Sequence, residues 1–489
     1  MSLMDLIKKN EAINGDGKDN KGYIEEIRTQ IQNNPISDIT DKDGNQYIDI
    51  VLEGGGVLGI ALIGYTYTLE QAGIRFLNIA GTSAGAINAL FLAALGKPDS
   101  LKSQKILEIF NEMDMKSFVD GGVFAKGLVD DIKTKDNIWT AMLPKIGLLW
   151  AEGKFSKAKL GINPGKAFEE WLGEKLKEHG VTITNDLLQN LINPDDLQIR
   201  DPARQSDEQE YFTQNFKKNE LAIVSADITT QTKVIFPKMA ALYWENPLAK
   251  ALPAKFVRAS MSIPLFFQPL IIPDIPKDNK NCWKTLTGYE GEIPTSVHFV
   301  DGGIVSNFPI DVFHRKDRIP LCPTFGVKLG VDRNEPRKME SMGDFIGALF
   351  DTARHTSDYS FLFQNTDYQK LIAYIDTSEK FKRKKLSLIE KIKPKNWFSK
   401  NDLEDYHWLD FEMSDEKKVA LFTLGAKTAY EFIVGNEKTR KNNPDKSKKI
   451  DEILPFDWKD YKNIRAECKI TYTLVEISKR KGIENYSIC

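Results

Sequence analysis

The sequence is poor in the features that mark secreted, membrane-spanning and metal-binding proteins. It has four cysteines, Cys282, Cys322, Cys468 and Cys489. They show no C-x-x-C spacing, which argues against a zinc site or a disulfide framework and favours a reducing cytosol. No window reaches the roughly 18 apolar residues of a membrane span, and the first residues lack the apolar stretch of a signal peptide. We therefore expect a cytoplasmic protein, either soluble or peripheral at a membrane.

Net charge is nearly absent as well. The chain has 67 Lys and Arg against 69 Asp and Glu, a net charge of −2. This balance gives no global attraction to nucleic acid or to anionic lipid, so any such contact must be local. We expect no nucleic-acid partner, and the sequence does not indicate an oligomeric state. Of the 489 residues, 41% are hydrophobic, which is enough for a sizeable core.

The stretch from Tyr47 to Leu95 carries the strongest structural pattern. Two β-rich apolar runs, Ile48 to Leu52 and Phe76 to Ala80, alternate with two longer runs of helical character. The pattern predicts a βαβα unit with two strand-to-helix turns, and each turn has a chemical signal.

The second turn, Gly81-Thr82-Ser83-Ala84-Gly85, matches G-x-S-x-G. In this motif a tight turn strains the serine backbone and lifts its Oγ clear of the sheet, and the flanking glycines let strand and helix pass closely. The N-terminal dipole of the following helix favours negative charge at the serine. Ser83 is therefore a candidate nucleophile, supported by Gly81 and Gly85.

The first turn contains Gly54, Gly55 and Gly56, followed by Gly59. Consecutive residues without Cβ can leave backbone N–H groups bare, which makes an oxyanion hole or a phosphate cradle. Gly54, Gly56 and Gly59 also match the G-x-G-x-x-G pattern of dinucleotide sites, but the acidic ribose ligand should follow near the end of the next strand. That strand ends in G-T-S-A-G instead, so we favour an oxyanion hole.

A glycine triplet about 25 residues before G-x-S-x-G, in adjacent βα turns, resembles the patatin-like phospholipases and lipid acyl hydrolases. Four later segments are also similar to that family: Leu221 to Phe236, Val257 to Leu270, Phe299 to Pro309 and Phe411 to Ile433. The resemblance implies a three-layer α/β/α fold with a mostly parallel central sheet. It places a catalytic domain at residues 47–435, between a polar N-terminal extension (1–46) and a C-terminal extension (436–489).

The resemblance also implies a mechanism. Asp301, in the turn Asp301-Gly302-Gly303, would complete a catalytic dyad with Ser83 and accept its proton directly, while the Gly54–Gly56 turn holds the oxyanion. The substrate would be a carboxylic ester of a lipid at a membrane surface, cleaved through an acyl-enzyme without metal or cofactor. Leu58 stands where the family usually has Arg or Lys, so the resemblance supports an ester bond in the substrate more strongly than a phospholipid head group. Neutral lipids and thioesters become stronger candidate substrates.

Three alternatives remain open. Phe118 to Gly122 repeats the pentapeptide around Asp301, which makes Asp120 a rival base, although it lacks the flanking Arg-Ala-Ser and Asn-Phe-Pro segments. An α/β-hydrolase triad would need a histidine downstream, and the candidates are His314, His355 and His407. A non-catalytic lipid-binding protein on the same frame is the third.

Two further segments bear on membrane contact. Lys380 to Lys395 interleaves many basic residues with leucine and isoleucine, which suits either an anionic lipid surface or a solvated helix face. Trp139 to Trp150 is apolar and suits a lid or a helix packed on the core.

Some weaker patterns predict single elements. We expect helices over 23–32, 102–113 and 345–366, a strand over 466–477, and an irregular surface insertion over 193–219.

Overall fold

The computed structural model describes residues 3–17, 20–122, 142–144, 147, 160–330, 336, 339–377, 381–382, 403–404, 406–435 and 455–480. Its centre is a mixed sheet in which five neighbouring strands are parallel, while β10 (Ser296–Asp301), β9 (Leu270–Pro273) and β7 (Thr232–Pro237) are joined to it by antiparallel pairings. The order across the sheet is β12 (Ile372–Ile375), β11 (Thr324–Leu329), β2 (Gln46–Leu52), β3 (Ile74–Thr82), β6 (Leu221–Asp227), β10 and β9, with β7 also paired to β6.

The pairing of β6 brings two distant strand ends together. One edge of β6 pairs with β7 from Ala222 to Asp227, so β3 and β10 must share the other edge. Thr82 of β3 pairs with Val224, and Asp301 of β10 pairs with Ser225. Because β3 is parallel and β10 antiparallel to β6, their carboxyl ends meet head to head at the middle of this strand.

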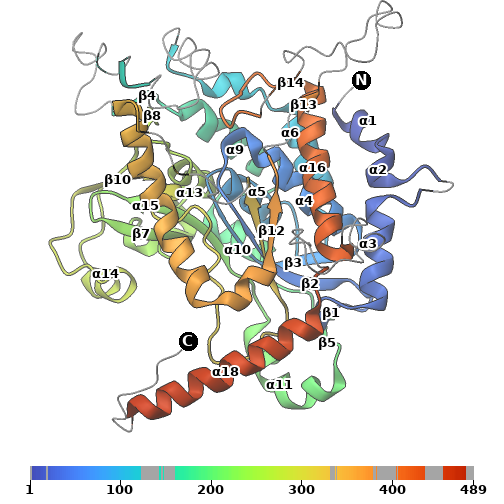
Figure 1. Ribbon diagram of the computed structural model, residues 1–489. Helices are drawn as coiled ribbons and strands as arrows, with labels where there is room; N and C mark the ends of the chain where they lie inside the picture. Colours follow the sequence, from blue (N-terminus) through green and yellow to red (C-terminus); the bar gives the residue numbers. More distant parts are fainter. Residues whose placement is uncertain are drawn as a thin grey trace, which may run out of the picture.

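Helices cover both faces of the sheet. On β11, Phe325 packs against Phe432 of α16 (Asp415–Val434), with ring centroids 4.9 Å apart. The Lys328 ammonium points to the other face and lies 4.9 Å from the ring of Tyr359 in α15 (Met342–Gln364). Figure 1 shows α16 with α4 (Gly59–Gln71) on one side of the sheet and α15 on the other. The predicted three-layer α/β/α architecture with mostly parallel central strands is confirmed.

The N-terminal residues pack onto this core. The helices α1 (Leu3–Lys8), α2 (Glu11–Asn14) and α3 (Gly22–Asn33) bury apolar side chains in the main hydrophobic core. Tyr23 of α3 stacks on Tyr430 of α16 at 4.8 Å. The helix predicted over 23–32 is confirmed.

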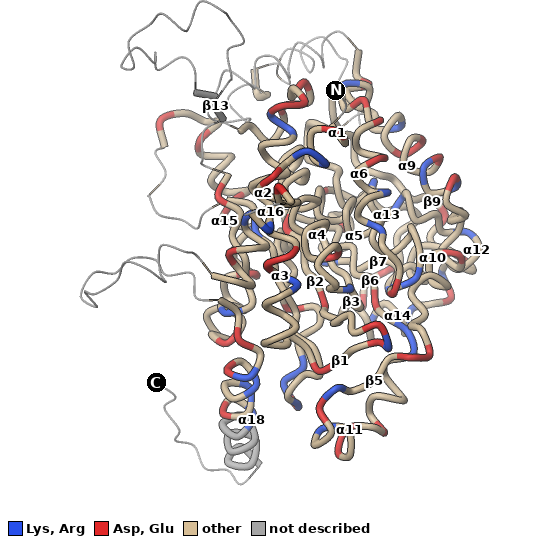
Figure 2. Tube along the Cα trace, turned by 90° about the vertical axis from the view of Figure 1, so that its right-hand side faces the viewer, with Lys and Arg blue, Asp and Glu red and all other residues tan. Residues whose placement is uncertain are grey.

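The remaining elements surround these layers. They are β1 (Ile39–Thr40), α5 (Ala84–Ala94), α6 (Ser103–Glu112), β4 (Gly161–Asn163), α9 (Lys166–Glu178), α10 (Thr184–Asn190), β5 (Gln198–Ile199), α11 (Pro202–Asn215), α12 (Pro247–Lys250), α13 (Pro253–Ser260), β8 (Leu265–Phe267), α14 (Lys280–Thr287), β13 (Phe381–Lys382), β14 (Leu403–Glu404) and α18 (Trp458–Arg480). Along the traced chain in Figure 2, cationic and anionic residues are interspersed.

Of the other four weaker predictions, two are confirmed and two are wrong. The helices expected over 102–113 and 345–366 are present as α6 and α15. The insertion over 193–219 is not irregular, because it contains α11. The strand expected over 466–477 lies inside α18, where Tyr461 and Arg465, one turn apart, are buried against Asp367. This helical spacing of buried side chains outweighs the local β propensity.

Candidate active site

Ser83 lies in a strained turn between β3 and α5. Its φ and ψ are 52° and −118°, a left-handed φ that non-glycine residues rarely adopt. A Cβ on Gly81 would lie 2.3 Å from the Gly85 carbonyl oxygen, and one on Gly85 would lie 2.2 Å from that of Leu52. The two glycines therefore let strand and helix come close enough to make the turn.

A buried serine from α13 fixes this turn. The Ser83 N–H donates to the Ser260 Oγ at 2.9 Å, and the Ser260 hydroxyl donates in turn to the Val224 carbonyl at 2.5 Å. Thr82 also donates from Oγ1 to the Ser306 carbonyl, at 3.0 Å, which ties the turn to the loop after β10. The Arg-Ala-Ser segment noted in the sequence thus supplies a support for Ser83.

Asp301, at the end of β10, faces the serine. The two side chains are nearly buried, with 6% of Ser83 and 7% of Asp301 exposed. The carboxylate accepts from the Gly303 N–H at 2.6 Å. Burial raises the pKa of Asp301, while the Arg354 guanidinium, this N–H and the Ser83 hydroxyl lower it. The Ser83 hydroxyl lies near enough to Asp301 to lower its pKa, and such contacts commonly tighten when substrate binds.

The glycine turn presents unused N–H groups beside the serine. The Gly54 N–H donates to the Asn307 carbonyl at 3.1 Å, and the Gly55 carbonyl accepts from the Leu58 N–H at 3.2 Å. Within the described residues, the N–H groups of Gly55 and Gly56 have no acceptor. In a trans peptide the N–H points opposite to the C=O, so the occupied carbonyls of Gly54 and Gly55 direct these two donors away from Asn307 and from the Leu58 N–H. A Cβ on Gly54 would lie 3.1 Å from that of Ser83, which shows how close the turn and the nucleophile are.

A polar network around Asn307 supports the glycine turn, and sequence reasoning missed it. The Asn307 amide donates to the Gly54 carbonyl at 3.1 Å and to the Glu53 carboxylate at 3.2 Å. Glu53 also accepts from the Leu329 N–H at 2.6 Å, and Arg354 donates to Asn307 Oδ1 at 2.6 Å. Asn307 lies in a segment that resembles the family, but nothing local in the sequence marks Glu53 or Arg354.

An apolar pocket opens next to Ser83. Its walls come from the start of α4, α5, α6 and the segment after it, α9, the segment after α13 and the segment before α16. The lining side chains are Val57, Ile60, Ala84, Ile87, Phe110, Met113, Met115, Phe118, Phe168, Met261, Ile263, Phe267, Leu409 and Phe411. A pocket of this composition fits a hydrocarbon chain.

Steric contacts also explain the glycines of the Asp301-Gly302-Gly303 turn and Gly59 after the first glycine turn. A Cβ on Gly302 would lie 2.1 Å from the Val224 carbonyl, and one on Gly303 would lie 2.8 Å from the Asp301 carboxylate. A Cβ on Gly59 would lie 3.0 Å from that of Ala84. These positions leave no room for a side chain near the candidate dyad.

The rival candidates have other partners. Asp120 accepts from the N–H groups of Gly165 and Ala167, at 3.0 and 3.2 Å, at the start of α9. His314 packs between the rings of Phe361 and Tyr368. In the part of the chain that the structure describes, neither Asp120 nor any histidine is hydrogen-bonded to Ser83 or Asp301.

Two sequence predictions fall outside this site. Most of the basic segment Lys380 to Lys395 and most of Trp139 to Trp150 lie outside the described residues. Among the helices that are described, none is long and apolar enough to cross a bilayer. The same residues contain no group of three or more His, Cys, Asp or Glu arranged to hold a metal ion.

Comparison with known proteins places the chain in a family. The family model described as patatin-like phospholipase matches residues 50–314, more than half of the chain. The uncharacterized protein YqhO of Bacillus subtilis is 27% identical over 389 residues, which cover 79% of this chain and 98% of YqhO. The crystal structure of VipD from Legionella pneumophila aligns with a TM-score of 0.33 and 15% identity over 92% of this chain and 81% of VipD. On the family match, the chain belongs to the patatin-like phospholipases, a family of lipid acyl hydrolases.

Proposed function

We propose that this protein hydrolyses carboxylic esters of lipids with Ser83 as nucleophile and Asp301 as general base. Of the three glycines predicted for the oxyanion hole, Gly55 and Gly56 would donate, because the Gly54 N–H is already bonded to Asn307. Gly54 would act through its carbonyl, which orients the Gly55 N–H. The acyl chain would lie in the apolar pocket beside Ser83.

In the first half of the reaction, Asp301 takes the hydroxyl proton of Ser83 as Oγ attacks the ester carbonyl. The negative charge on the carbonyl oxygen is held by the N–H groups of Gly55 and Gly56, and one such donor typically contributes about 3 kcal/mol. Asp301 then gives its proton to the leaving alcohol, and the acyl group stays on Ser83.

In the second half, Asp301 takes a proton from water, which attacks the acyl-enzyme and releases the fatty acid. Asp301 returns that proton to Ser83 Oγ, so the enzyme ends as it began. A carboxylate with an ordinary pKa is a weak base for an alcohol. The burial that raises the pKa of Asp301 makes it a stronger one.

The observation that carries the proposal is the meeting of β3 and β10 on one edge of β6. The strained serine and the buried carboxyl lie at these two strand ends. The glycine turn with its two unused N–H groups lies beside the same serine, which lines the apolar pocket. Each group has the chemical nature that acyl transfer requires at its position.

Mass spectrometry after treatment with a fluorophosphonate probe tests the assignment. We expect label on Ser83, none in Ser83→Ala, and a decrease of about 10²–10⁴-fold in p-nitrophenyl ester turnover in Asp301→Asn. Asp120→Asn and the single alanine variants of His314, His355 and His407 are the controls and should keep turnover. Labelling that is unchanged in Asp301→Asn but lost in Asp120→Asn would reverse the choice of base. Full turnover in Ser83→Ala would exclude the proposal.

A further inference from the structure

We propose that α15, which lies beyond the family match, is part of the catalytic machinery: its Arg354 holds the oxyanion turn and supplies the cation that Leu58 does not. This inference rests on the hydrolase function proposed above. Arg354 is a positioning residue in this role, since it acts through Gly54, Asn307 and Asp301.

Arg354 contacts the glycine turn and Asn307 through two hydrogen bonds. Its Nη2 donates to the Gly54 carbonyl at 3.3 Å and to Asn307 Oδ1 at 2.6 Å. Because the Gly54–Gly55 peptide is planar and trans, holding the Gly54 carbonyl fixes the direction of the Gly55 N–H. The guanidinium therefore orients the donor that the proposed mechanism needs.

A second side chain of α15 holds the same loop one helical turn later. The Asp358 carboxylate accepts from the Ser306 hydroxyl at 2.6 Å and from the N–H groups of Asn307 and Phe308 at 2.9 and 2.8 Å. Residues four apart lie on one face of a helix, so Arg354 and Asp358 clamp Asn307 together. Asn307 in turn connects the loop after Asp301 to the glycine turn, which means that α15 sets the distance between the two.

The guanidinium also places a positive charge at the site. Leu58, at the position where a cation was expected, is buried in the hydrophobic core and is only 9% exposed. Burial raises the pKa of both Asp301 and Glu53. The Arg354 charge lowers the pKa of Asp301, and the Lys328 and Arg354 charges lower that of Glu53. Its Nε is buried and has no hydrogen-bond partner among the described residues.

Besides Arg354, two groups lower the pKa of Asp301. The Ser83 hydroxyl comes from the turn after β3, and the Gly303 N–H comes from the loop after β10. The pKa of Glu53, the residue after β2, is also lowered by Lys328 of β11. Without Arg354 the Asp301 carboxylate is harder to form. The base works deprotonated, so the acid limb of kcat/KM should move to higher pH.

The test measures kcat, KM and the pH profile of p-nitrophenyl ester hydrolysis by full-length Arg354→Gln. We expect kcat to fall about 10–100-fold with KM changed less than about threefold. The acid limb should rise by about 0.5–1 pH unit. Arg354→Lys keeps the charge, but its side chain is one bond shorter, so the ammonium does not reach both acceptors of Nη2. Its kcat should therefore fall while its acid limb stays in place. The matched control is Arg315→Gln, whose side chain is 58% exposed beside Glu220 and should leave both quantities unchanged.

The outcomes separate this inference from the function on which it rests. If wild type hydrolyses the ester but Arg354→Gln has the wild-type kcat and acid limb, the role of α15 is refuted and the hydrolase remains. An acid limb that moves equally in Arg354→Lys and Arg354→Gln would refute the claim that the positive charge at this position lowers the pKa of Asp301. If wild type shows neither turnover nor Ser83 labelling, the hydrolase itself fails. Should circular dichroism show Arg354→Gln to be unfolded, Arg354→Lys decides: a lower kcat with an unmoved limb supports the proposal, and an unchanged kcat overturns it.

Discussion

At the scale of the residue, the two glycines proposed to donate to the oxyanion have different reasons to be glycine. Gly56 has a φ of +57°, and a Cβ there would lie 2.2 Å from the backbone carbonyl of Trp408. Gly55 has an extended φ of −172°. A Cβ on Gly55 would meet mainly the end of the Leu329 side chain, which can turn aside. Gly56 is therefore required by backbone conformation and space, whereas Gly55 is required by neither.

This difference predicts unequal effects of the same substitution. Gly56→Ala must leave the left-handed region or push Trp408 away, and we expect about 2 kcal/mol loss of unfolding free energy. Because its N–H would shift, kcat should fall about 100-fold. Gly55→Ala, the matched control, should lose less than about tenfold in kcat. Urea unfolding and ester turnover measure both, and equal losses in the two variants would contradict the argument.

Local motifs mark some of the residues at this site and miss others. The G-x-S-x-G turn marks Ser83 locally. Asp301 is marked by the resemblance to the family, since the same five residues also surround Asp120. Ser260, Glu53 and Arg354 act by contacts across the fold, with 177 positions separating Ser83 from Ser260 and 300 separating Gly54 from Arg354. Such contacts depend on packing, and no spacing in the sequence encodes them.

At the scale of the element, α4 carries the glycine turn at its start and is held by a close crossing with α16. A Cβ on Gly64 of α4 would lie 2.0 Å from the Phe422 carbonyl, and one on Gly425 of α16 would lie 1.8 Å from that of Ala61. The two glycines let the backbones touch. The crossing therefore fixes the position of α4 against α16, and with it the position of the glycine turn.

Gly64→Ala and Gly425→Ala should each force the helices apart and lower the unfolding free energy by about 3 kcal/mol, the upper range for overpacking. Ester turnover should fall with it, since α4 begins directly after the turn. The control is Gly173→Ala in α9, where a Cβ would meet only Ala254 at 3.9 Å. That helix should gain about 0.5–1 kcal/mol. A Gly64→Ala variant as stable as wild type would show that the crossing can relax.

Helices and strands were predicted correctly where the turn, strand and helix patterns of the sequence agree. The βαβα unit from Tyr47 to Leu95 has turn, strand and helix signals that agree, and the structure has it. The segment after Ala466 is rich in isoleucine, threonine and valine, which favour strands. It is helical because it continues α18, whose first turns dock Trp458, Tyr461 and Arg465 into the core.

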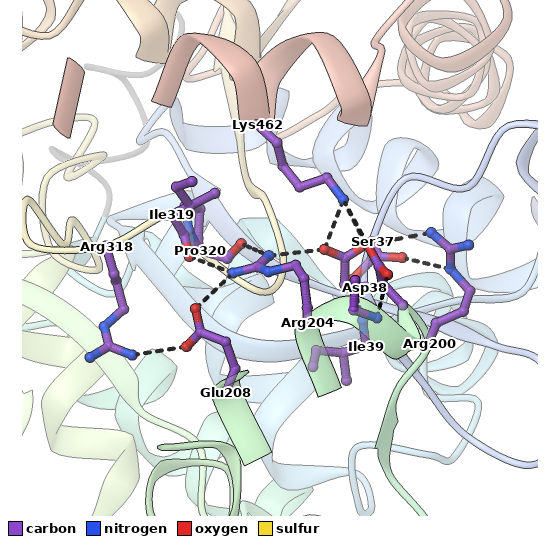
Figure 3. A network of polar contacts seen from close by, with 12 residues as sticks. Ser37, Asp38, Ile39, Arg200, Arg204, Glu208, Arg318, Ile319, Pro320 and Lys462 are labelled. Carbon is purple, nitrogen blue, oxygen red and sulfur yellow. Dashed lines mark hydrogen bonds and ion pairs between the residues drawn. The ribbon is translucent and has the colours of Figure 1, made fainter. Parts of the chain in front are cut away.

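At the scale of the whole molecule, one buried carboxylate joins three distant parts of the chain. Asp38 lies before β1, and its side chain is fully buried. It pairs with Arg204 of α11 at 2.9 Å, with Arg200 at 3.5 Å and with Lys462 of α18 at 3.0 Å. Figure 3 shows these cations converging on Asp38, with Glu208 and Arg318 extending the network. The N-terminal segment, α11 and α18 are thus held together at one point.

Asp38→Asn should therefore lower global stability without changing the chemistry. It keeps the shape but leaves three cations around a neutral amide, and breaking a buried ion pair typically costs about 3 kcal/mol. Lys462→Met leaves Asp38 with both arginines and should cost about 1 kcal/mol. Asp317→Asn, whose side chain is 68% exposed beside Arg318, is the control and should stay within about 0.5 kcal/mol of wild type. Asp38 lies near the start of β2, whereas the glycine turn follows its end, so kcat below the unfolding transition should be unchanged in all three variants. A fall in kcat in Asp38→Asn that precedes any loss of circular dichroism would show that this network also reaches the active site.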